Sequence, residues 1–142
     1  MTTSGADLTK EQKAVLDALA DVLVPRSGGW PSASEAEVGA RWAERALLAL
    51  PELTEALTDV LDEAGPGDAK GFLRRLEEED RPRFDMLVLV VVGAYYLSPK
   101  VRRRLGYTGP QRTPAGEGEA ELYLEDGILE PVKARGSIYR RA

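Results

Sequence analysis

An uninterrupted apolar run near the middle of the chain limits most strongly what this sequence can fold into. Across residues 86–94, no side chain is charged or strongly polar. The run is too short to cross a bilayer, which takes about 20 apolar residues. It therefore belongs in the interior of a folded domain, where we expect other segments to cover it on all sides.

The β-branched residues of this run leave a helix and a strand both open, because periodicity does not separate the two. The flanks favour a helix. Asp80 and Pro82 form a helix start. Ser98 and Pro99 form a stop, because a residue that precedes proline avoids the α region. The neighbouring segments also have helical patterns, so a lone strand would lack a partner. We therefore expect a buried central helix over residues 82–97.

The spacing of apolar residues predicts further helices over residues 10–24, 35–49, 52–64 and 69–78. Thr9 and Gln12 have the spacing of a capping box. Ser34 and Glu37 have the same spacing, and Asp68 can cap the helix that follows it. The predicted fold class is all-α, a compact bundle of about five to six helices around the buried central helix.

The length of 142 residues corresponds to one domain, or one domain with a tail. We expect a disordered lead over residues 1–7, a helical bundle domain over residues 8–110, and a linker and extended C-terminal arm over residues 111–142. Within the arm, residues 121–125 form either a helical turn that stops at Gly127 or a strand. The strand would enter a hairpin with Ile128 and Leu129.

Composition argues against several classes of function. The chain has no Cys and no His, which removes disulfides, thiolate nucleophiles, the usual zinc sites and the commonest general base. We interpret the acidic run at residues 77–80 as a solvated face and a turn. A metal site is the more specific alternative. We therefore predict no catalytic, cofactor-binding or metal-binding residues and no enzyme activity of the chain by itself.

The charge and the N-terminal sequence suggest where the chain works. A net charge of −5 argues against nucleic acid and anionic membranes as partners. The first residues have neither a basic region nor an apolar one, so we see no signal peptide and expect a cytoplasmic location without direct membrane insertion. The basic stretch at residues 100–104 is expected to pair with acidic groups of this chain or of a partner.

Two glycines and a tryptophan mark the loop over residues 26–34. Gly28 and Gly29 suit backbone turns at positive φ. A phosphate-binding loop is an alternative, although the Walker spacing and its lysine are absent. Trp30 either covers the end of the helical core or anchors a partner, since tryptophan is enriched in interface hot spots.

Aromatic residues near turns are the candidates for a partner interface, because tyrosine can bury its ring while its hydroxyl finds a partner. Tyr95 and Tyr96 point about 100° apart on a helix, so at most one of them faces outward. The predicted interface residues are Trp30, Tyr96, Pro99, Tyr107, Pro110, Tyr123, Ile128 and Tyr139.

Four segments in this order resemble a known family. They are LDALADVLVP at residues 16–25, GWPSASEA at residues 29–36, GAYYLSPKV at residues 93–101 and LGYTGP at residues 105–110. Together they look like the gluconate 2-dehydrogenase subunit 3 family, the small subunit of membrane-bound sugar dehydrogenases. The resemblance covers residues 8–110, and the last two segments are its most specific part.

The resemblance implies a function without catalysis. Members are small helical proteins that bind no flavin and pair with a larger FAD-dependent subunit of the glucose–methanol–choline type. They help that subunit to fold, stay stable or be exported. Many carry a twin-arginine leader. This sequence has none, so we expect a complex that stays in the cytoplasm or is exported by another route. The alternatives are an independent small-ligand binder or enzyme with a pocket lined by Tyr95 or Tyr107, or a DNA-associated regulator.

Overall fold

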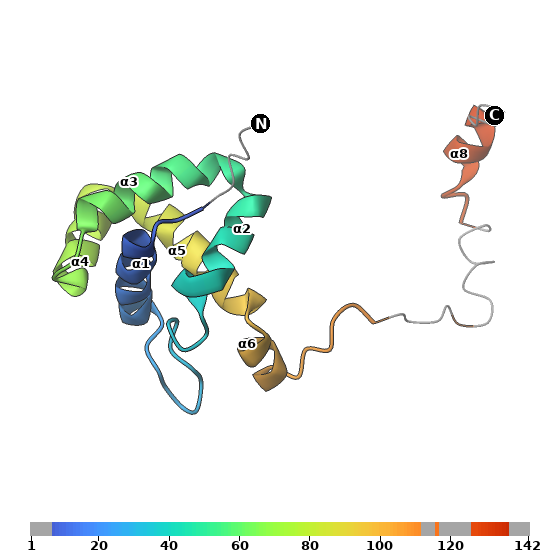
Figure 1. Cartoon of the computed structure of the whole chain (residues 1–142). Helices are drawn as coiled ribbons and strands as arrows, with labels where there is room; N and C mark the ends of the chain where they lie inside the picture. The colour runs from blue at the N-terminus through green and yellow to red at the C-terminus, as the bar shows by residue number, and fades with distance from the viewer. Residues whose placement is uncertain (1–6, 112–115, 117–125, 137–142) are drawn as a thin grey trace. The chain divides into compact units, whose positions relative to one another are not determined.

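Helices make up most of the described part of the chain, which comprises residues 7–111, 116 and 126–136 of a computed structural model (Figure 1). These residues contain no strand beyond an isolated antiparallel bridge between Ser27 and Trp30. The chain divides into two units, Met1–Thr108 and Gly109–Ala142. The all-α fold class is confirmed. The disordered lead expected over residues 1–7 lies outside the described residues, except for Asp7.

In chain order, the first unit contains α1 (Lys10–Leu23), the π-helical η1 (Val38–Trp42), α2 (Ala43–Ala49), the 3₁₀ turn η2 (Pro51–Leu53), α3 (Thr54–Ala64), α4 (Ala69–Glu79), α5 (Arg81–Leu97) and α6 (Pro99–Arg104). The second unit contains α8 (Glu130–Arg135). None of the helices in the described part of the chain combines the length and the apolar character that a membrane span needs.

Local capping explains why several helices begin where the sequence predicts. The hydroxyl of Thr9 accepts from the N–H of Gln12, and the Gln12 side chain accepts from the N–H of Thr9, which completes the capping box of α1. Asp68 accepts from Gly71 at the start of α4. Asp80 caps α5 in the same way. These caps satisfy N–H groups that have no partner within the helix.

The central helix α5 packs against α2, α3, α4, α6 and η1. Its buried side chains are Leu87, Val90, Val91, Ala94 and Tyr95. With them lie buried leucines and valines of the neighbouring elements, such as Leu16, Leu47 and Leu57, which are fully inaccessible. Removal of this apolar surface from water drives the bundle together.

The expectation that the apolar run is covered on all sides is wrong. Leu89, Val92 and Tyr96 are 54%, 39% and 53% exposed. They recur at the three- and four-residue spacing of one helical stripe. The reason is geometric, because the helices that pack on α5 bury one side of it and leave this stripe open. We call these three residues the α5 stripe.

The second predicted helix also differs from the structure. Residues 33–37 form turns, Glu37 has a left-handed backbone (φ 66°), and the helix begins as the π-helical η1. Ser34 is not its cap. The reciprocal hydrogen bonds of a capping box form instead two residues earlier, between Ser32 and Glu35. The N–H of Ser32 donates to the Glu35 carboxylate (2.8 Å), and the N–H of Glu35 donates to the Ser32 hydroxyl (3.3 Å).

The second unit also departs in part from the prediction. Residues 130–135 form α8, where we expected an extended arm, and Ile128 and Leu129 lie in a turn before it rather than in a hairpin strand. Pro131 at the start of α8 and Gly136 after it (φ 70°) explain the short helix. Residues 121–125 lie outside the described part.

Gly39 allows the close approach of η1 to α1. A Cβ at this position would lie 2.6 Å from Oδ1 of Asp17 and 2.7 Å from the carbonyl oxygen of Lys13. We therefore predict that Gly39→Ala lowers the free energy of unfolding by about 1–3 kcal/mol, measured by urea denaturation.

The matched control is Gly93→Ala. Gly93 is exposed on α5, and an added Cβ would meet nothing within 4 Å. This change should raise the free energy of unfolding by about 0.5–1 kcal/mol, because alanine loses less backbone entropy on folding. Equal stability of the two variants would contradict the packing role of Gly39.

Candidate functional site

The loop between α1 and η1 is held by polar contacts on both sides. Asp21 on α1 accepts from the N–H (2.8 Å) and the hydroxyl (2.6 Å) of Ser34. Asp17, one turn earlier, accepts from the N–H of Gly39 (2.9 Å). On the other side, the Tyr95 hydroxyl donates to the carbonyl oxygen of Pro31 (2.8 Å). The loop is therefore fixed between α1 and α5.

The tip of this loop is a tight turn that presents Trp30. Ser27 and Trp30 exchange two backbone hydrogen bonds across Gly28 and Gly29. The φ angles of the two glycines are 55° and 79°, as in a type I′ turn, so the expected positive φ is confirmed. Trp30 is half-buried and packs against the core, so its covering role is confirmed in part.

Arg104 joins α6 to this turn. Its guanidinium lies 5.4 Å from the centre of the Trp30 ring, within the range of a cation–π interaction. It also donates to the carbonyl oxygen of Gly28 (3.2 Å). A Cβ on Gly29 would lie 2.7 Å from the same guanidinium, so a side chain there would displace it. The indole and the guanidinium thus form one fixed unit at the surface.

Two grooves meet at Trp30. The first, which we call the apolar groove, has a volume of about 440 Å³. Its lining residues are Val24, Pro25, Ser27, Gly28, Trp30, Tyr95, Tyr96 and Leu105. The second, which we call the cationic groove, has a volume of about 480 Å³. Its lining residues are Arg26, Gly29, Trp30, Pro31, Glu35, Lys100 and Arg104.

The apolar groove brings together two of the predicted interface residues, Trp30 and Tyr96. Tyr95 is buried and Tyr96 is exposed, so the expectation that at most one tyrosine faces outward is confirmed. The two rings meet edge to face, with centroids 5.9 Å apart. Burial, with Tyr96 and Glu35 nearby, raises the pKa of the Tyr95 hydroxyl, which keeps its proton and its bond to the loop.

The other predicted interface residues do not join this groove. Pro99 is half-buried at the start of α6, while Tyr107 and Pro110 are exposed beyond its end. Ile128 is exposed in the second unit. Tyr123 and Tyr139 lie outside the described residues. Their role in an interface stays a prediction.

Sequence reasoning did not single out Leu105 or two members of the α5 stripe, Leu89 and Val92, as surface residues, and it named Arg104 only within the basic stretch at residues 100–104. The stripe has no periodic signal because every residue around it is also apolar. The spacing of Lys100 and Arg104 by one helical turn was a usable signal for Arg104. Leu105 follows α6 directly and is 51% exposed. Its sequence neighbours give no signal that separates it from a buried core leucine.

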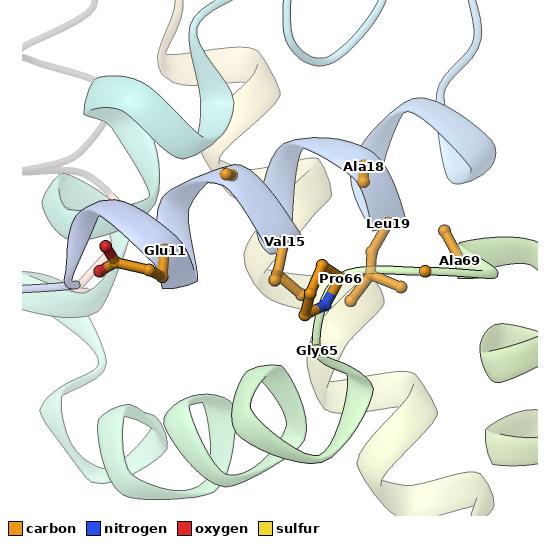
Figure 2. A pocket seen from close by; sticks show the side chains of 9 residues that line it. Glu11, Val15, Ala18, Leu19, Gly65, Pro66 and Ala69 are labelled. Atoms are coloured by element: carbon orange, nitrogen blue, oxygen red, sulfur yellow. The ribbon is translucent and has the colours of Figure 1, made fainter.

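A further pocket of about 390 Å³ lies between α1 and the connection from α3 to α4 (Figure 2). We call it the α1 pocket. Figure 2 shows Glu11 at one end of the row of α1 side chains and Leu19 near Ala69 at the other. Its lining residues are Glu11, Ala14, Val15, Ala18, Leu19, Gly65, Pro66, Gly67 and Ala69. Neither Tyr95 nor Tyr107 lines it, so the predicted ligand pocket around those tyrosines is not this one.

Several carboxylates in and near the acidic run at residues 77–80 make local contacts within the chain. Glu77 and Asp85 both pair with Arg81, and Asp80 caps α5. No group of three His, Cys, Asp or Glu side chains in the described residues is placed to hold a metal ion. The phosphate-binding alternative needed a helix start near Ser34, and the structure has turns there instead.

Comparison with protein-family models, with curated proteins and with solved structures gives no significant match for this chain.

Asp17 gives a prediction about pH. Burial raises the pKa of its carboxyl above the ordinary 3.8, the Gly39 N–H opposes this, and the Asp21 carboxylate adds to it. The folded state therefore binds more protons than the unfolded chain just above pH 3.8, and the free energy of unfolding falls as pH rises through the folded pKa. Asp17→Asn keeps an acceptor for Gly39 and should remove this fall.

Urea denaturation from about pH 4 to about pH 7 measures the effect as the difference between wild type and variant at each pH. Asp59→Asn, which removes an exposed carboxylate on α3, is the control. The same pH dependence in wild type and Asp17→Asn would contradict the prediction.

Proposed function

We propose that this chain is a non-catalytic subunit that binds and stabilises a larger protein through the surface around Trp30. The observation that supports this most is the clustering of exposed apolar side chains there. Tyr96 and Leu105 line one groove with Trp30, and Val92 lies one turn before Tyr96 on α5. Contiguous exposed apolar surface of this kind marks interaction sites.

The surface also has the rigidity that a binding site needs. Trp30 packs against the core, and the Arg104 guanidinium lies 5.4 Å from the centre of its ring. The loop that carries it is tied to α5 through Tyr95 and Pro31. Residues that are already ordered lose little side-chain entropy on association, which favours binding. Tryptophan and tyrosine in such positions are frequent hot spots.

The partner that we propose is a larger FAD-dependent oxidoreductase of the glucose–methanol–choline type, acting on a sugar or glycoside. This part rests on the resemblance of residues 8–110 to the gluconate 2-dehydrogenase subunit 3 family. The most specific segments of the resemblance begin at the end of α5, and Tyr95, Tyr96 and Leu105 of these segments line the apolar groove. FAD would belong to the partner, and a cytoplasmic location is part of the proposal.

The test is purification of the tagged chain from its native host, with flavin absorbance followed through gel filtration. We expect the chain to elute with a flavoprotein larger than itself. A monomer without flavin would contradict the proposal. Fractionation of the same cells measures the location.

Point variants test the surface itself. We expect Tyr96→Ala to weaken the complex by about tenfold or more, because it removes an exposed aromatic side chain from the centre of the surface. Leu48→Ala is the matched control, because Leu48 is 60% exposed on α2 and does not line the groove. Equal dissociation constants for the two variants would contradict the assignment of the surface.

A second candidate function is the binding of a small apolar ligand, which the α1 pocket favours. Its volume of about 390 Å³ falls within the range of small-molecule sites, about 300–1,000 Å³. Glu11 is the one charged residue among those that line it. We propose this function as an alternative to the subunit role, with 1-octanol as the first probe.

Ala18→Leu tests this alternative. The larger side chain would enter the α1 pocket from the exposed side of α1. We expect the wild-type chain to bind 1-octanol in ligand-observed NMR and Ala18→Leu to lose that binding. Ala49→Leu adds the same bulk at an exposed site on α2 and should bind as wild type does. Unchanged binding by Ala18→Leu would exclude the pocket as the site.

A further inference from the structure

The surface around Trp30 has a charge that differs from that of the whole chain. The net charge of the chain is −5, but α6 carries a cation at four of its six positions. Lys100 and Arg104 reach the cationic groove, and Arg26 faces it from the loop. Glu35 is the one carboxylate that lines this groove. The groove is therefore a positive site on an acidic protein.

The cations of the groove differ in how far they are already neutralised. Arg26 donates to the Glu35 carboxylate (2.7 Å). Lys100 donates to the Glu35 carbonyl (2.9 Å) and lies 3.5 Å from the Glu37 carboxylate. No carboxylate of the described residues lies within ion-pair distance of Arg104. Among the three cations that line this groove, Arg104 is therefore the one whose charge no carboxylate of the described residues neutralises.

Arg104 is also the cation that is best placed in advance. The Trp30 ring and the Gly28 carbonyl hold it in one orientation, and the hydrogen bond to Gly28 uses one of its five N–H donors. A guanidinium fixed in this way can receive a carboxylate through two parallel hydrogen bonds at little cost in side-chain entropy.

Trp30 lines both the cationic and the apolar groove, so one ligand can use both sites. We propose that the surface binds an acidic segment of the partner protein, with a carboxylate on Arg104 and a neighbouring apolar side chain in the groove beside Tyr96 and Leu105. This inference rests on the proposed function, since it states what the partner presents to the surface.

Charge favours an acidic protein segment over a nucleic acid. A nucleic acid would bring a phosphate at every nucleotide, and some of these would face Glu35 and Glu37. The net charge of −5 would also repel a polyanion at longer range. A protein segment can instead place a carboxylate at Arg104 and uncharged side chains near Glu35 and Glu37.

The experiment measures binding of a labelled, end-blocked peptide of glutamate, phenylalanine and glycine by fluorescence anisotropy. A matched peptide has glutamine in place of each glutamate. We expect the acidic peptide to bind the whole chain at least about tenfold more tightly than the matched peptide, and its affinity to fall as salt rises. Arg104→Gln should weaken the acidic peptide by about tenfold and leave the matched peptide unchanged.

Two further variants keep the result interpretable. Lys70→Gln removes an exposed cation from α4 and should leave binding unchanged. Tyr96→Ala should weaken both peptides, because it alters the apolar groove. Circular dichroism checks that each variant folds. Equal binding of the two peptides, no effect of Arg104→Gln, or tighter binding of a single-stranded oligonucleotide would each overturn the inference.

The same variants separate this inference from the function on which it rests. If the flavoprotein co-purifies equally well with wild type and Arg104→Gln at low and high salt, the acidic-segment inference fails and the subunit role stands. If no larger protein co-purifies but the acidic peptide still requires Arg104, the subunit role fails and the site remains a receptor for acidic segments.

Discussion

The one-sided burial of α5 is the constraint on which the rest of the structure depends. Five other elements pack on this helix, and its buried face supplies much of the core. Because residues 86–94 of α5 include no charged or strongly polar side chain, the side that those elements leave open is also apolar. The same sequence property therefore builds the core and leaves the α5 stripe, which continues to the groove at Tyr96.

Polar bonds complete what apolar packing begins. The loop between α1 and η1 has few buried side chains, and it is fixed by the carboxylates of Asp17 and Asp21 and by the Tyr95 hydroxyl. Buried or half-buried polar groups are costly when unpaired, so these bonds favour one loop conformation over others. That conformation brings Trp30 next to α6, where Arg104 covers it. The candidate surface is thus assembled from segments that are far apart in the sequence.

The sequence predicts those parts of the fold that local interactions decide. α1, α4 and α5 each begin after a residue whose side chain accepts from the N–H three residues later. The end of α5 follows from Pro99, because the residue before a proline avoids the α region. The start of η1 does not follow in this way, because the pairs Ser32 and Glu35 or Ser34 and Glu37 have the same spacing. In the structure Ser34 binds Asp21 and the reciprocal pair forms between Ser32 and Glu35. A local sequence pattern does not reveal the contact with Asp21, which is 13 residues away. The apolar groove was beyond prediction for a similar reason, since it depends on the long-range bond between Tyr95 and Pro31. Of its members, Trp30 and Tyr96 were chosen in advance as interface residues and Tyr95 as the lining of a pocket, all from residue type.

The close contact between Gly29 and the Arg104 guanidinium has a consequence for sequence variation. Any side chain at position 29 would occupy the space of the guanidinium, and the positive φ of that residue disfavours a side chain as well. Two positions in different segments are therefore coupled. Homologous chains that keep an arginine at position 104 should keep glycine at position 29, whereas those that lose the arginine should vary there more often, chiefly to residues such as asparagine that tolerate a positive φ.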